Sequence, residues 1–220
     1  AGRLTVVEAA TGAERVHFQH RDRVMSAAFF PDGTKAVSSS PDGPIFIWDL
    51  LGDPGKWDAA KADAVWTDLA SADARTAFAA IRKLRANPAE AVALLNDRVN
   101  PPQAPADERV TQWLRDLDSP RFQAREQAQR ELTSAADAIR LKLEAARKGA
   151  TDEAGRRLDQ ILKATDAGTA DTLRQVRACE VLEGIGTPEA VRVLRGWAGG
   201  PDGARLTQEA KESLTRLGRE

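Results

Sequence analysis

The fold is decided by residues 20–49, whose sequence is HRDRVMSAAFFPDGTKAVSSSPDGPIFIWD. Three runs rich in β-branched, aromatic and small residues follow one another in this stretch: Val24–Phe30, Lys35–Ser39 and Pro44–Trp48. A Pro-Asp-Gly tripeptide separates each run from the next, and these residue types are typical of tight turns. The stretch therefore predicts a three-stranded antiparallel meander.

Two further runs of the same kind precede this stretch. They cover residues 4–7 and 15–18, with a Thr11-Gly12 turn signal between them. Because turn signals recur about every ten residues, we expect residues 1–50 to be β structure throughout.

Residues 20–49 resemble a WD40 repeat. The pattern of that family is a Gly-His dipeptide, a strand, a Pro-Asp-Gly turn, a second strand, an Asp-bearing turn, and a third strand ending in Trp-Asp. All parts occur in order here, ending in Trp48-Asp49, except that Gln19 stands in place of the Gly. The resemblance covers about residues 3–50, which is one blade of a β-propeller and the remnant of a preceding blade.

The resemblance implies a structural hydrogen-bond network formed by His20, Ser38, Asp42 and Trp48. A buried imidazole, carboxylate and indole N–H each need a partner, so bonding them to one another is the stable arrangement. His20 and Asp42 could also be interpreted as a catalytic dyad. A general base needs access to substrate, however, so we expect these residues to fix the strands and we expect no enzyme activity.

The composition changes at Leu51–Lys56, which contains two Gly and one Pro in six residues. We interpret 51–57 as a linker and 58–220 as a helical domain, because Ala, Leu, Arg and Glu then dominate and apolar residues recur every three to four positions. Roughly nine short amphipathic helices are expected. From residue 119 the expected helices are Ser119–Thr133, Ala135–Lys148, Asp152–Ala164, Asp171–Glu183, Pro188–Gly196 and Ala204–Leu217.

The helices expected after residue 119 have similar lengths and short turns between them, which is typical of helical repeats. Residues 120–132 and 173–185 resemble HEAT-type helices, with small Ala residues on the inner face. The predicted fold class is thus a multidomain β + α chain: a partial WD40 β-propeller followed by an all-α, HEAT-like domain.

The charge balance argues against nucleic acid as a partner. Lys and Arg number 32 against 33 Asp and Glu, so the net charge is -1. One local cluster is basic: Arg140, Lys142, Arg147, Lys148, Arg156 and Arg157. Phosphate binding is one interpretation of this cluster, and a solvated helix end is the other. Because acidic residues are interspersed and no aromatic residue is adjacent, we favour the second.

Cys179 is the only cysteine, and there are only two histidines. An intrachain disulfide and a Cys-based zinc site are therefore excluded, and we expect no cofactor or metal. Cys179 falls on the apolar stripe of an expected helix and is interpreted as a core thiol. No run of ~18 apolar residues is present, so no membrane span is expected. A single cysteine is compatible with a reducing compartment, and a cytoplasmic location is favoured.

A closed propeller needs at least ~4 blades of ~40 residues each, and residues 1–50 are too few. The remaining blades must then come either from a parent chain upstream or from another chain. We favour the first source, in a protein similar to large bacterial WD40 proteins. The expected function is a non-catalytic scaffold for protein partners whose identity the sequence does not reveal. The alternative is an accessory tail of a larger enzyme or signalling protein whose catalytic domain lies upstream.

Overall fold

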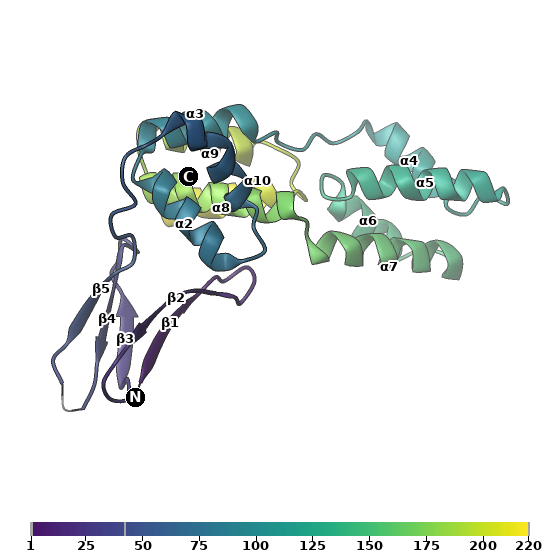
Figure 1. The fold of residues 1–220 in the computed structure, drawn as a ribbon. Coiled ribbons are helices and arrows are strands. Elements are labelled where there is room, and N and C mark those ends of the chain that lie inside the picture. Colours follow the sequence, from purple (N-terminus) through teal and green to yellow (C-terminus); the bar gives the residue numbers. More distant parts are fainter. Residues whose placement is uncertain (1, 42, 220) are drawn as a thin grey trace. The chain divides into compact units, whose positions relative to one another are not determined.

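A computed structural model describes residues 2–41 and 43–219, and its described part consists of five strands followed by helices (Figure 1). The prediction that β structure precedes α structure is confirmed. The strands form an antiparallel hairpin and an antiparallel meander of order β3-β4-β5. Their bounds are β1 Arg3–Val7, β2 Glu14–Gln19, β3 Ser26–Phe29, β4 Lys35–Ser39 and β5 Phe46–Asp49.

The register of the meander decides which side chains share a face. Ala36 pairs with Trp48 and Phe29. Directly paired residues point to the same side of a sheet, so these three side chains share one face. Val37 pairs with Ile47, and by alternation along the strand this pair lies on the opposite face.

The change from strands to helices falls between Asp49 and Ala59. The helical elements are η1 Ala59–Lys61, α1 Ala62–Leu69, α2 Ala74–Arg85, α3 Pro88–Arg98, α4 Asp107–Asp116, α5 Phe122–Ala135, α6 Arg140–Arg147, α7 Asp152–Ala167, α8 Ala170–Ile185, α9 Pro188–Ala198 and α10 Arg205–Arg216. Proline is the first residue of α3 and α9, where its missing N–H costs nothing. Asp73 and Thr151 cap α2 and α7 by accepting a backbone N–H.

The chain divides by packing into two compact units. The first comprises Ala1–Arg98 and Glu180–Ala190, and the second comprises Val99–Cys179 and Val191–Glu220. All the strands therefore belong to the same unit as α1, α2 and α3. The boundary between the units lies well beyond the change from strands to helices.

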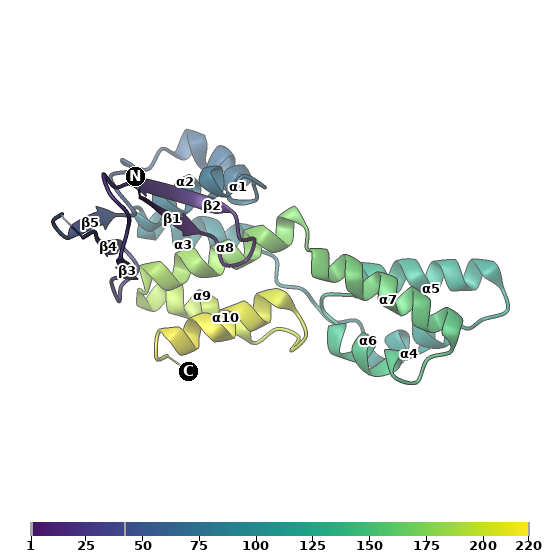
Figure 2. The ribbon, with the colours of Figure 1, turned by 90° about the horizontal axis from the view of Figure 1, so that it is seen from below.

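Each unit has a core of apolar helix positions. In the first unit, Leu69, Ala77, Ile81 and Leu84 are fully buried. In the second unit, α4 to α7 lie together (Figure 2). They share one core, whose buried members are Val110, Leu117, Ala128, Leu132, Ala136, Ile139, Leu143, Ala154, Leu158 and Ile161. Cys179 is fully buried, at the position where the sequence predicts a core thiol.

Candidate functional site

A buried polar network lies inside the β segment, the part of the chain that contains strands β1 to β5 (residues 3–49). His20 follows β2, Ser38 lies in β4 and Trp48 lies in β5. The Nε2 atom of His20 is 2.6 Å from Ser38 Oγ, and Trp48 Nε1 donates to the same Oγ at 2.7 Å. His20 and Ser38 are each 2% exposed. One hydroxyl thus joins an imidazole and an indole from different parts of the β segment.

The fourth residue of the network expected from the sequence, Asp42, lies outside the described residues. Nδ1 of His20 is buried, and no hydrogen-bond partner for it occurs among the residues that the structure describes. If that nitrogen carries the proton, then Nε2 accepts the Ser38 hydroxyl proton, while Ser38 Oγ accepts from Trp48. A carboxylate near Nδ1 would complete the network.

Aromatic rings enclose this network. Phe18 of β2 stacks on Trp48 with ring centroids 4.6 Å apart, and Trp48 stacks on Phe46 at 5.4 Å. The edge of His20 meets Phe46 at 4.9 Å. The imidazole is therefore held between rings and shielded from water. This environment suits a group that fixes strands better than one that exchanges protons with a substrate.

Several large apolar side chains of the β segment are exposed, next to charged ones such as Arg3, Lys35 and Asp49. The large exposed apolar residues here are Val7, Met25, Phe29, Ile45 and Ile47. Phe29 is 62% exposed on one face of the β3-β4-β5 sheet, and Ile47 is 61% exposed on the other face. The face that carries Ile47 also carries the Lys35–Asp49 pair, so this face is partly polar. On each face a large apolar side chain is thus open to contact with a partner.

A charged cluster attaches the hairpin to the helices of the first unit. Arg15 of β2 donates to Glu180 of α8 at 2.6 Å and to the buried Glu8 at 2.9 Å. Its guanidinium also lies 5.4 Å from the ring centre of Phe78 in α2. Burial alone lowers the pKa of Arg15, but hydrogen bonds and charge from Glu180 and Glu8 raise it above its usual range. Arg15 therefore stays charged, and removing either carboxylate would disturb a buried ion pair.

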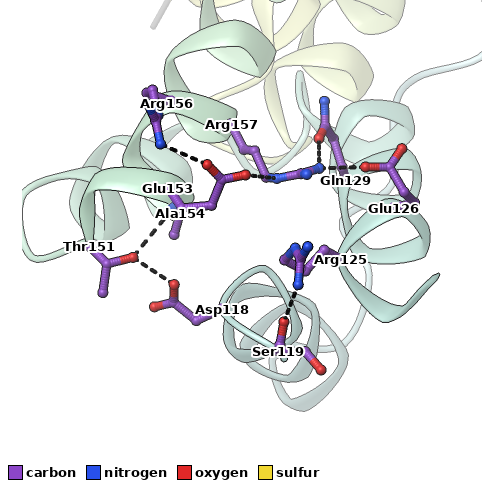
Figure 3. A network of polar contacts seen from close by, with 10 residues as sticks. All are labelled: Asp118, Ser119, Arg125, Glu126, Gln129, Thr151, Glu153, Ala154, Arg156 and Arg157. Atoms are coloured by element: carbon purple, nitrogen blue, oxygen red, sulfur yellow. Dashed lines mark hydrogen bonds and ion pairs between the residues drawn. The ribbon is translucent and has the colours of Figure 1, made fainter. Parts of the chain in front are cut away.

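A second polar network joins α5 and α7 in the other unit (Figure 3). Arg157 donates to Glu126 at 2.7 Å and to Glu153 at 2.9 Å, and it also bonds Gln129. The hydrogen bond from Arg157 lowers the pKa of Glu153, burial opposes this, and Arg156 adds to the lowering. These side chains line a hollow of about 300 Å³ whose carboxylates and guanidinium groups already pair with one another.

The basic cluster predicted from the sequence is largely neutralised. Five of its six members lie within 4.0 Å of a carboxylate: Arg140 beside Glu144 and Asp166, Lys142 beside Asp107, Arg147 beside Asp159, and Arg156 and Arg157 beside Glu153. A phosphate would have to compete with these partners. The cluster is thus a set of intramolecular ion pairs on a helical surface.

Two other kinds of site are absent from residues 2–41 and 43–219. No group of three or more His, Cys, Asp or Glu side chains there could hold a metal ion. None of the helices in that part of the chain has the length and apolar character needed to cross a bilayer. No family model, curated protein or solved structure matches the chain.

The charged contacts of the β segment were missed by sequence reasoning. Arg15 and Glu180 are 165 positions apart, and no local pattern connects them. The Glu153–Arg157 pair has the four-residue spacing of a helix ion pair and could have been predicted from that spacing alone.

Proposed function

We propose that this chain is a non-catalytic protein–protein interaction module, composed of a WD40-type blade followed by a HEAT-like helical region. The observation that carries the proposal is the exposure of large apolar side chains on both faces of the β3-β4-β5 sheet. Covering one Phe or Ile side chain is worth roughly 1.5–3 kcal/mol, so a partner that covers several gains considerable free energy.

The partner that we propose for this sheet is another β-sheet, namely a further propeller blade of the parent protein. Two sheets pack face to face ~10 Å apart and interdigitate apolar side chains. Phe29 offers such a side chain on one face and Ile47 on the other, so a blade would pack on each face. The His20, Ser38 and Trp48 bonds support this proposal, because they hold the strands in fixed register without a partner. Protein partners of the scaffold would then bind to the completed assembly.

Crosslinking and mass spectrometry on the native protein test the proposal. Lys35 lies exposed in β4, so its amine can report which peptides approach the sheet. We expect Lys35 to crosslink to sequences outside residues 1–220, and we expect these crosslinks to be lost in Phe29→Ser and Ile47→Ser variants.

The matched control is Leu141→Ser, because Leu141 is 54% exposed but lies on α6. This variant should keep the Lys35 crosslinks. If Lys35 crosslinks only within residues 1–220, or if the sheet variants behave like the control, the proposal is wrong.

A further inference from the structure

The segment between β5 and the first helical turn has the composition of a flexible tether, with Gly52, Pro54 and Gly55 close together. Its backbone carbonyls are nevertheless bonded by side chains of α2 and of the residues just after it. Arg82 donates to the carbonyl of Leu51, Lys83 donates to those of Pro54 (2.9 Å) and Lys56, and Asn87 donates to that of Gly55 at 3.4 Å. Three carbonyls of this segment are therefore bonded by side chains of α2, and a fourth is bonded by Asn87 just after α2.

Local bonds fix the same segment from within. The Asp49 carboxylate accepts the N–H groups of Leu51 at 3.0 Å and Gly52 at 2.9 Å. Gly52 has φ +59, a left-handed conformation, and a Cβ there would lie 2.6 Å from the Arg82 guanidinium. The left-handed backbone therefore favours glycine at this position.

The residues of α2 that reach the β segment share one side of that helix. Arg75 bonds Glu14 of β2 at 2.6 Å, Phe78 lies under Arg15, and Arg82 bonds Leu51. Positions 75, 78 and 82 follow the three- and four-residue spacing of a single helix face. The fully buried Ala77, Ile81 and Leu84 form a separate stripe. Helix α2 thus has one stripe for the helical core and another for the β segment.

We infer that residues 51–57 are a rigid strap and that α2 is a coupling helix, which together make the β segment and α1 to α3 move as one body. A partner that binds the sheet would then displace or stabilise these helices as well. The inference depends on the contacts of α2 and not on the identity of the partner, so it stands or falls separately from the proposed function.

Backbone ¹⁵N relaxation of the full 220-residue chain tests this inference. Residues 100–106 serve as an internal comparison, since they are also a proline-containing connection outside helices and strands. We expect order parameters of about 0.85 in the strap and values below about 0.6 in residues 100–106. Equally low values in both segments would overturn the inference.

An Arg82→Met, Lys83→Met double variant tests the cause of the rigidity, because methionine keeps much of the aliphatic stem but donates no hydrogen bond. We expect the order parameters of the strap to fall below about 0.6 in this variant. The control is Arg115→Met, which changes an exposed residue of α4 and should leave the strap unchanged. Unchanged order parameters of the strap in the double variant would contradict the inference. If the double variant does not fold, the comparison of the strap with residues 100–106 in the unmodified chain decides.

Discussion

The β3-β4-β5 sheet and the α4–α7 helices use their apolar residues in opposite ways. In the helices, Leu132 and Leu143 are fully buried in a shared core. In the sheet, Phe29 and Ile47 are more than 60% exposed, while the polar Ser38 is buried. The helices therefore have their core within this chain, whereas the sheet presents outward the type of side chain that other folds place inside.

This difference separates two kinds of mutational effect. A change in the helical core should reduce the free energy of unfolding, because a cavity remains where a side chain was. A change on the outer faces of the sheet should leave that free energy almost unaltered and should instead affect association. The buried polar network of the sheet lies between these extremes, since its bonds are internal but few.

The largest effect is expected for Leu132→Ala in α5. Leu132 is fully buried, so truncation should lower the free energy of unfolding by about 2–5 kcal/mol, measured by urea denaturation followed by circular dichroism. Leu141→Ala, at an exposed position of α6, is the control and should change it by less than about 0.5 kcal/mol. Equal losses in the two variants would show that α4 to α7 do not form a self-sufficient core.

A smaller loss is expected for Ser38→Ala, which removes the oxygen that bonds His20 and Trp48. Leaving buried polar groups unpaired costs about 1–3 kcal/mol, and the indole N–H resonance of Trp48 should shift in the ¹H–¹⁵N spectrum. Ser39→Ala is the matched control. Ser39 is adjacent, and its carbonyl oxygen accepts the backbone N–H of Met25, a bond that the substitution keeps. A Trp48 resonance that responds equally to both variants would contradict this description of the network.

Ile47→Thr should have almost no effect on stability, within about 0.5 kcal/mol, because Ile47 is 61% exposed and threonine is also well tolerated in strands. It should, however, reduce the binding of a hydrophobic dye such as ANS to the 220-residue chain. If dye binding is unchanged in Ile47→Thr but falls in Leu141→Thr, the exposed apolar surface lies on the helices rather than on the sheet.

The smallest effect is expected on the pH dependence of unfolding in acid, and it concerns Glu153. The pKa of Glu153 is lowered mainly by the hydrogen bond from Arg157. Such a carboxyl stabilises the fold above its unfolded-state pKa of about 4.3, and this contribution is lost as the pH falls through the lower folded-state value. Denaturation curves below about pH 4 should therefore depend less on pH in Glu153→Gln than in the parent chain. An unchanged pH dependence would show that this ion pair adds nothing measurable.

Much of the β segment could be predicted because its determinants are local. The strand Lys35–Ser39 has the predicted bounds, since Pro-Asp-Gly turn residues flank it on both sides. His20, Ser38 and Trp48 could be selected as a set because they occur at characteristic positions of one short motif. Their hydrogen bonds, at 2.6 Å and 2.7 Å, join positions only 18 and 10 residues apart.

Features that depend on distant contacts could not be predicted. A helix was expected from Ala135, but α6 begins only at Arg140. The intervening turn contains Asp137, whose carboxylate accepts the backbone N–H of Arg205, 68 positions away. The bonds from Arg82 and Lys83 to the strap were missed for a similar reason, because any surface cation of a helix has the same sequence pattern.

Hydroxyl-radical footprinting with mass spectrometry tests the central claim most directly, because side-chain oxidation follows exposure to solvent. The measurement compares the isolated 220-residue chain with the native protein from its source cells. Met25, Phe29 and Ile47 should be oxidised more slowly in the native protein, whereas Phe122 and Leu141, which are exposed on α5 and α6, should react equally in both. If Met25, Phe29 and Ile47 react as fast in the native protein as in the isolated chain, nothing covers the sheet and the account is wrong.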